Sequence, residues 1–261
     1  MGTNVQVLTE ERHAFIRGRL AAEGKVLASE LAARFGVSED TVRRDLRELA
    51  KAGECRKVYG GAVVMAATYP GPASAREAFA PEAKARLAAT AAKLVAPGQT
   101  IFLDVGTTNA AIARAIPQGI ELTVATNSLA VASALAGNGS IDLIVLGGAF
   151  DRESGGCLGG DALQAIAQLN ADLLFLGACG IDATRGVTAF DQADAEVKRA
   201  MVRNSGGIVV ATTSDKLSTA APFRVAAPEA VTHLVVEANA PSRVLAAFRR
   251  LGAKVHFAPG E

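Results

Sequence analysis

Two kinds of hydrophobic spacing divide this chain of 261 residues. Near the amino end, apolar residues recur every three or four positions, which is the spacing of amphipathic helices. Beyond residue 100, consecutive apolar runs such as Thr100–Val105 and Leu122–Thr126 alternate with glycine-rich or polar turns and helical stretches. Such runs are typical of buried parallel strands. The pattern predicts a small helical domain followed by a larger α/β domain, whose mostly parallel sheet is covered by helices.

The stretch Ser38–Leu49 predicts a DNA-recognition helix. Ser38 is a suitable N-cap, and an apolar stripe recurs at i, i+4 and i+7 from Val42. Another side of the helix is rich in guanidinium groups, which can read guanine edges in the major groove. The expected DNA contacts on this helix are Ser38, Thr41, Arg43, Arg44, Arg47 and Lys51. The alternative is a solvated helix face whose arginines are balanced by Asp45 and Glu48.

The flanking residues favour a winged helix-turn-helix. Glu30–Phe35 predicts a short helix that Gly36 ends by adopting a left-handed conformation, which gives helix, turn and second helix. Downstream, Glu54–Tyr59 is short and β-prone and is followed by two glycines, so we expect a β-wing. Two cations of that wing are placed to reach a phosphate backbone: Arg56 and Lys57.

Residues 10–62 resemble the N-terminal domain of the DeoR family of bacterial transcriptional regulators. The resemblance rests on Val37-Ser38, on the run TVRRDL at 41–46 and on the closing Gly60-Gly61-Ala62. Tyr59 departs from the pattern, because the family usually has a histidine before the two glycines. The resemblance implies a winged helix-turn-helix that binds double-stranded operator DNA.

Composition predicts a linker between the two domains, and net charge limits how DNA can be bound. The stretch 62–80 contains Pro70-Gly71-Pro72, so we expect a linker there, between a domain at 1–61 and a domain at 81–261. Arg76, the one basic residue of the linker, either contacts the body or is solvated, and the sequence favours solvation. The net charge is only +1, so DNA binding must depend on where the arginines point.

Three cysteines, Cys55, Cys157 and Cys179, show no paired spacing, and the three histidines are scattered. This pattern favours reduced thiols, as in a reducing cytosol, and predicts neither a metal site nor a cofactor. No apolar run reaches the ~18 residues that a membrane span needs, and no signal peptide is recognisable. We therefore expect a cytoplasmic protein with no membrane partner.

Polar loops at the expected carboxyl ends of the strands predict an anion site. Gly106-Thr107-Thr108 offers backbone N–H groups, two hydroxyls and a helix N-terminus. Other residues are expected to add hydrogen bonds, room for a ligand or positive charge: Asp104, Asn127, Ser128, Gly147, Gly148, Asp182, Lys198 and Lys216. Each has an ordinary alternative, such as a helix cap for Ser128 or a solvated surface position for Lys198. The glycines at 155–160 predict a flexible loop.

Residues 76–257 resemble the effector domain of the same family, through LDVGTT, TNS at 126–128 and FLGACGID at 175–182. That domain is similar to sugar-phosphate isomerases of the ribose-5-phosphate type. The resemblance implies a phosphorylated sugar or a related metabolite as effector. The stretch TTSDK at 212–216 departs from the family's shorter Asp-x-Ser-Lys, which leaves the register of Lys216 open.

Both resemblances indicate a non-enzymatic, sequence-specific DNA-binding regulator, a repressor of a sugar or carbohydrate catabolic operon that a phosphorylated sugar controls. The alternative is a sugar-phosphate isomerase with an incidental N-terminal domain, for which Asp182 and Glu196 are possible bases. Residues 183–190 lack the lysine and glycine-rich stretch that such isomerases carry after their aspartate motif, so we favour the regulator. A palindromic operator would call for a homo-oligomer, either a dimer or a tetramer.

Overall fold

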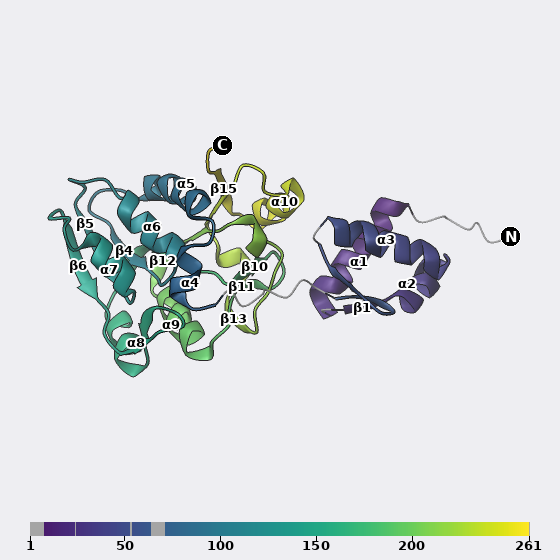
Figure 1. Cartoon of the computed structure of the whole chain (residues 1–261), viewed down its shortest axis with the longest axis horizontal. Helices are drawn as coiled ribbons and strands as arrows, with labels where there is room; N and C mark the ends of the chain where they lie inside the picture. The colour runs from purple at the N-terminus through teal and green to yellow at the C-terminus, as the bar shows by residue number, and fades with distance from the viewer. Residues whose placement is uncertain (1–7, 24, 53, 64–70, 261) are drawn as a thin grey trace. The chain divides into compact units, whose positions relative to one another are not determined.

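The computed structural model describes residues 8–23, 25–52, 54–63 and 71–260 of the chain (Figure 1). Contacts divide the molecule into two compact units, Met1–Ala66 and Ala67–Glu261, and each is described by itself. The central part of the expected 62–80 linker, residues 64–70, lies outside the described residues. None of the helices in the described ranges is long and apolar enough to cross a membrane.

The N-terminal unit has the predicted winged helix-turn-helix fold. It consists of α1 (Thr9–Glu23), β1 (Lys25–Leu27), α2 (Ala28–Phe35), α3 (Glu39–Lys51), β2 (Arg56–Val58) and β3 (Gly61–Val63). The strands form an antiparallel sheet in the order β1-β3-β2, in which β2 and β3 make the wing. The helices pack around a core that includes Ile16, Leu31 and Leu46.

Local sequence explains the position of α3. Gly36 has a φ of 64°, the left-handed conformation that ends α2. The Ser38 hydroxyl then accepts a hydrogen bond from the backbone N–H of Thr41 at 3.2 Å, which caps the start of α3. Val42 and Leu46 are 0% and 1% exposed, so the apolar stripe packs inward as predicted.

The larger unit is built on a sheet of seven parallel strands in the order β15-β14-β12-β9-β4-β5-β6. These strands are β4 (Thr100–Leu103), β5 (Leu122–Thr126), β6 (Ile141–Val145), β9 (Ala171–Phe175), β12 (Ser205–Ala211), β14 (His233–Val236) and β15 (Lys254–Phe257). From β4 the chain moves to β5 and β6, and then returns at β9 on the other side of β4. The boundary between β4 and β9 is therefore the topological switch point, where open α/β sheets bind ligands.

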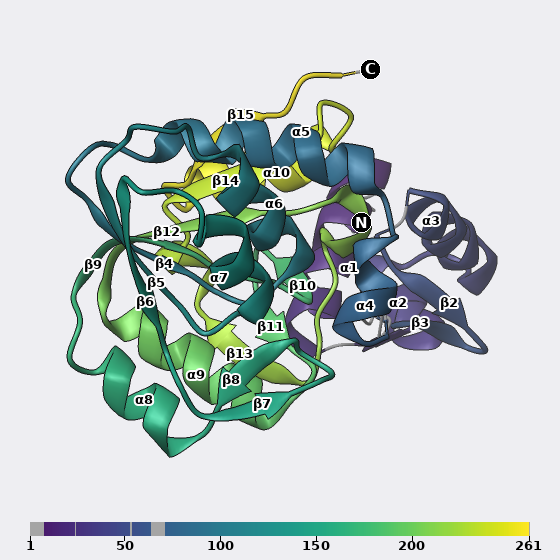
Figure 2. The ribbon, with the colours of Figure 1, turned by 60° about the vertical axis from the view of Figure 1, so that its left-hand side comes forward.

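Helices cover both faces of this sheet (Figure 2). One face carries α5 (Pro81–Ala91), η1 (Ala92–Leu94), α6 (Thr107–Ala115) and α7 (Leu129–Leu135), and the other carries α8 (Gly160–Ile166), α9 (Gln192–Arg203) and α10 (Ser242–Arg250). Successive sheet residues alternate between the two cores: Ile101 packs under α5 and α6, whereas Phe102 packs under α8 and α9. This is the predicted parallel sheet covered by helices.

Shorter elements lie outside the seven-stranded sheet. They are α4 (Ala73–Glu77), the hairpin of β7 (Ala149–Asp151) and β8 (Gly156–Leu158), the antiparallel strands β10 (Gly180–Asp182), β11 (Gly186–Ala189) and β13 (Phe223–Ala226), and the short helices η2 (Ser214–Lys216) and η3 (Pro228–Ala230). Two expectations are corrected here. Of the glycines expected in a flexible loop, Gly156 belongs to β8 and Gly160 to α8, whereas Gly155 lies in the β7–β8 turn and Gly159 is the N-cap of α8. Part of the expected linker is helix α4.

Candidate DNA-binding surface and ligand cavity

The predicted cations of α3 all lie on its exposed side, and so does Ser38; Thr41 is half-buried. Arg43 donates to Glu39 at 2.8 Å and is therefore partly engaged within the helix. The Arg44 side chain is 78% exposed and lies 3.6 Å from Glu48. Exposed ion pairs of this kind are weak and easily exchanged for a phosphate or a base. Arg44 is thus more open to a ligand than Arg43, whose side chain is 50% exposed.

The wing presents a second group of exposed side chains. Arg56 and Lys57 on β2 are exposed, as predicted. Tyr59, at the tip between β2 and β3, is fully exposed at 106%. The wing therefore offers two cations to a phosphate backbone.

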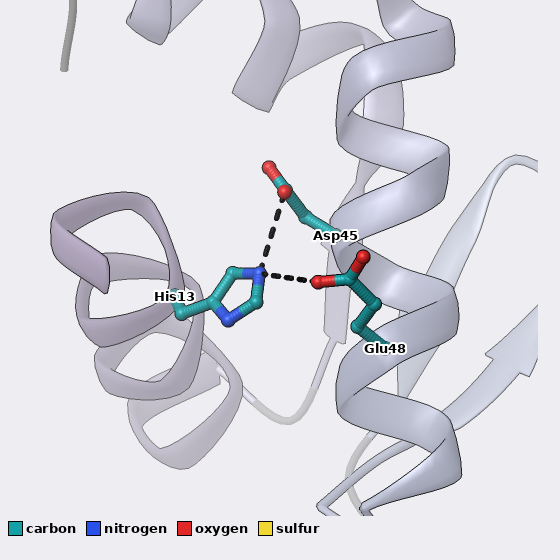
Figure 3. Close-up of side chains that lie close together, drawn as sticks. All are labelled: His13, Asp45 and Glu48. Atoms are coloured by element: carbon teal, nitrogen blue, oxygen red, sulfur yellow. Dashed lines mark hydrogen bonds and ion pairs between the residues drawn. The ribbon is translucent and has the colours of Figure 1, made fainter. Parts of the chain in front are cut away.

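Behind α3, a buried cluster joins this helix to α1 (Figure 3). Asp45 is 3% exposed and accepts hydrogen bonds from Arg12 Nε at 2.7 Å and Arg12 Nη2 at 3.0 Å. His13 Nε2 lies 3.3 Å from Asp45 Oδ1 and 3.9 Å from Glu48 Oε2. Asp45 is therefore no solvated counter-ion of the arginines, which corrects the alternative interpretation above.

This cluster positions α3. The hydrogen bonds that Arg12 donates to Asp45 raise the pKa of Arg12 despite burial, so the guanidinium stays charged. His13, Asp45 and Glu48 also bring potential metal ligands together. However, both oxygens of Asp45 already accept from Arg12, and the adjacent guanidinium charge opposes a cation there. We assign the cluster to holding α3 against α1.

A cavity of about 420 Å³ opens at the switch point of the larger unit. It is lined by residues that follow β4, β9 and β12, by the first part of α9, by α4 and by the turn between β7 and β8. Its charged lining residues are Arg76, Asp151, Glu153, Asp191, Asp194, Lys198 and Lys216. The predicted residues Gly106, Thr107, Thr108, Lys198 and Lys216 all line it.

One wall of the cavity is the N-terminus of α6. Gly106 is the N-cap, with a φ of 145°, and no side chain caps this helix. The first N–H groups of a helix have no partner within it, so those of Thr107 and Thr108 can point to a ligand. Together with two half-buried hydroxyls, they form a site suited to an anion.

The floor of the cavity contains a buried ion cluster. Lys198 is 2% exposed, and its Nζ lies 2.6 Å from Asp104 Oδ2 and 3.0 Å from Asp194 Oδ1. Burial lowers the pKa of Lys198, but the charges of these two carboxylates outweigh it and raise the pKa, so the ammonium stays charged. Asp104 also accepts from the N–H of Gly177 at 2.9 Å. Asp104 thus ties the ends of β4 and β9 together from behind the cavity surface.

Two further cations at the cavity, Lys216 and Arg76, donate hydrogen bonds to backbone carbonyls. Lys216, at the end of η2, donates to the carbonyl of Ala178 at 2.9 Å. Its pKa is lowered by burial and also by the charges of Arg76 and Lys198. Arg76 on α4 donates to the carbonyls of Glu153 and Ser154 at 3.0 and 2.9 Å, which corrects the expected solvated position. An anion in the cavity would relieve the mutual repulsion of these cations.

Several predicted ligand residues are not among the described residues that line the cavity, because the fold itself uses them. Asn127 donates to the carbonyl of Cys157 beside β8, and the Ser128 hydroxyl caps α7 through Val131 N–H. Gly148 makes room for a neighbouring strand: a Cβ there would lie 2.4 Å from the Leu158 carbonyl oxygen. Two more lie away from the lining as well: Gly147 and Asp182.

The two carboxylates considered as isomerase bases are engaged elsewhere. Asp182 Oδ1 accepts from the N–H groups of Thr184 and Arg185 at 2.8 and 2.9 Å, which closes the turn between β10 and β11. Glu196 accepts from Gln192 at 3.1 Å on α9. Neither is among the described lining residues of the cavity.

Sequence reasoning did not assign some of the lining residues to the site: Arg76, Asp151, Ser154, Cys179 and Asp194. Asp194 was detectable, because it lies four residues before Lys198 on the same helix. The lining residues of the β7–β8 turn were not detectable from sequence, because the position of this turn beside β4 and β9 depends on tertiary packing.

Comparison with known proteins agrees with both the winged helix-turn-helix unit and the larger α/β unit that contains the cavity. Residues 12–68 match the DeoR-like helix-turn-helix domain, and residues 80–238 match the DeoR C terminal sensor domain. The chain belongs to the DeoR family. It is therefore a transcriptional regulator with an N-terminal DNA-binding domain and a C-terminal sensor domain.

Relatives in the DeoR family are similar over most of the chain. The glycerol-3-phosphate regulon repressor of Escherichia coli (strain K12) is 32% identical over 235 residues, which is 90% of this chain and 93% of the relative. The transcriptional repressor AccR of Agrobacterium fabrum (strain C58) is 32% identical over 212 residues, 80% and 82% of the two chains. These names describe repressors rather than enzymes.

Among solved structures, a ribose 5-phosphate isomerase A from Methanocaldococcus jannaschii is similar to 53% of this chain and 55% of its own. The identity is 19% and the TM-score is 0.39, a likeness too distant to say anything about function.

Proposed function

We propose that this DeoR-family regulator binds the phosphate of a phosphorylated sugar in the switch-point cavity. The observation that carries the proposal is the uncapped N-terminus of α6, which opens into the same cavity as Lys216 and Arg76. Backbone N–H groups, two hydroxyls and two cations are the partners that a phosphate dianion takes in proteins. Lys198 supports the site from below, because its ammonium remains bonded to Asp104 and Asp194.

The same proposal places operator DNA on the exposed side of α3 and on the wing. The N-terminal part of a recognition helix contacts base edges, and the wing contacts the backbone. We further propose a homo-oligomer, because a pair of recognition helices matches the two half-sites of a palindromic operator. A cytoplasmic location fits an operator-binding protein.

Arg44→Ala is expected to weaken operator binding by roughly 1–3 kcal/mol and to relax base preference at one position of each half-site, if Arg44 binds a guanine bidentately. The measurement is fluorescence anisotropy with a duplex that the full-length protein selects from a randomised pool. Binding of single-base variants of that duplex then gives the base preference.

Arg19→Ala is the matched control for Arg44→Ala. Arg19 pairs with Glu23 and Glu30, away from the exposed side of α3, and its removal changes the charge of the unit equally. A small change that is the same for every sequence is expected. If the two variants behave alike, Arg44 does not read a base.

Thr107→Ala combined with Thr108→Ala is expected to abolish the response of operator binding to a phosphorylated sugar while leaving operator binding itself unchanged. The change removes two hydroxyls from the α6 site, which belongs to the larger unit. Isothermal titration with a panel of sugar phosphates identifies the ligand for the unchanged protein. A variant that still binds this ligand with full affinity would place the phosphate elsewhere.

The affinity for that ligand is expected to fall as the pH rises from about 7.5 toward 10. Lys216 must be protonated to hold a phosphate dianion, and burial together with Arg76 and Lys198 lowers its pKa below the ordinary 10.5, against the opposing charge of Asp215. While the phosphate is a dianion, above its second pKa of about 6, affinity is therefore full below the lowered pKa of Lys216 and is lost as the pH rises through that pKa. Lys216→Arg stays charged over this range, so its titration curve should be flatter. An equal slope in both proteins would contradict the assignment.

A further inference from the structure

The short helix α4 (Ala73–Glu77) has contacts that the proposed function does not yet explain. It follows, in the chain, the segment 64–70 that joins the two units, and it is fixed to the larger unit at both ends. Near its start, Ala73 lies against the β7–β8 turn, where a Cβ on Gly155 would approach the Ala73 Cβ to 2.8 Å. Near its end, Arg76 donates one nitrogen, Nη2, to both Glu153 and Ser154 carbonyls of that turn.

Arg76 has hydrogen-bonding capacity that its two carbonyl partners do not use. Its Nε is buried and has no hydrogen-bond partner within the described part of the chain. The residue also lines the cavity beside Thr107 and Lys216. A buried N–H without an acceptor costs free energy, so a shift of the guanidinium that gives Nε an acceptor on a bound anion would be favoured. Arg76 can therefore bind a phosphate while Nη2 keeps its two carbonyls.

Lys84 holds the other side of α4. It lies on α5, is 7% exposed, and donates to the backbone carbonyls of Arg76 and Phe79. Burial lowers its pKa, and so do the charges of Lys216 and Arg76. Lys84 is not among the described lining residues of the cavity. The ammonium also lies over the Phe79 ring, 5.6 Å from its centroid. A buried ammonium held by carbonyls and a ring at the end of α4 has the geometry of an anchor rather than of a ligand contact.

We propose that α4 is a ligand-dependent strap, with Arg76 as its connection to the ligand and Lys84 as its anchor. The proposal rests on the proposed function. A phosphate at the α6 N-terminus completes the hydrogen bonds of Arg76 and so locks α4 against the β7–β8 turn and α6. Because α4 is the first helix of the larger unit's described residues, locking it fixes the start of this unit. Ligand binding thereby makes α4 more ordered.

The test is amide hydrogen exchange of peptides covering 71–80 in the full-length protein, with inorganic phosphate as the probe and chloride at equal ionic strength as the reference. Phosphate is expected to slow exchange in α4 at least about fivefold, the lower end of coupling between two sites. Unchanged exchange in this segment, while titration calorimetry shows that phosphate binds, would overturn the strap and leave the proposed function standing. Failure of phosphate to bind at all would overturn both.

Three variants sharpen the result. Lys84→Met is expected to bind phosphate with the affinity of the unchanged protein but to lose the slowing in α4, because the anchor acts on the strap alone. Arg76→Lys keeps a charge but lacks the planar fork, so it should bind phosphate more weakly and also lose the slowing. Arg114→Gln is the control, because Arg114 contacts Glu77 of α4 at 3.5 Å away from the cavity lining and should keep both properties. Slowing that survives in Lys84→Met and Arg76→Lys contradicts the proposal.

Discussion

Asp45→Ala is expected to destabilise the N-terminal unit by about 3–5 kcal/mol and to abolish operator binding. The substitution leaves the Arg12 guanidinium buried, at 7% exposure, without the carboxylate that now accepts its two hydrogen bonds. Breaking a buried ion pair by removing one partner typically has an effect of this size. Protection of α1 and α3 amides against hydrogen exchange should therefore fall by roughly two to four orders of magnitude.

Two comparisons isolate the cause of that loss. Asp40→Ala removes a carboxylate from the same helix, but the Asp40 side chain is 89% exposed, so the change should stay within about 1 kcal/mol. Replacing Arg12 and Asp45 together by leucine removes both charges, and this double variant should recover part of the stability. If Asp45→Ala is no less stable than Asp40→Ala, the cluster does not position α3.

Lys198→Met is expected to destabilise the sensor unit by about 3–5 kcal/mol at pH 7, because Asp104 is 0% exposed and would lose its cation. Without the ammonium, the pKa of Asp104 in the folded variant lies above its unfolded value. The stability linked to this group is then present at low pH and lost as the pH rises. The deficit should therefore shrink as the pH falls from 7 to 5, by at most about 1.4 kcal/mol for each pH unit.

Urea unfolding followed by circular dichroism measures this deficit. Lys93→Met, which removes an exposed lysine of η1 from the same unit, is the matched control and should change stability by less than about 1 kcal/mol. A pH-independent deficit in Lys198→Met would mean that Asp104 is not the group left unpaired.

The sequence predicts most reliably those features whose cause is local. The Ser38 cap, the Gly36 turn and the inward stripe of α3 depend on residues within one or two helical turns, and the structure has all three. Gly106-Thr107-Thr108 was also recognisable, because an apolar strand followed by a glycine and a helix start marks a strand end. Patterns of this kind need no knowledge of the partner elements.

Features that depend on distant contacts could not be predicted in this way. Asp45 carries the sequence signature of a surface acid, and only its pairing with Arg12, 33 positions earlier, explains its burial. Arg76 meets carbonyls that lie 77 and 78 positions later. From sequence alone, Gly148 could have made room for a ligand or for a neighbouring strand. The register of the β7–β8 hairpin places it against Leu158 of the neighbouring strand. Tertiary packing alone chooses between such alternatives.

The most direct test of the account is a titration of one operator duplex, selected from a randomised pool, with and without the sugar phosphate that binds most tightly. For the unchanged protein, we predict that the ligand alters operator affinity by roughly 5- to 150-fold. For Thr107→Ala with Thr108→Ala, the operator affinity should be the same with and without the ligand. An equal ligand response in both proteins, or no sequence-selective binding at any salt concentration, would contradict the account.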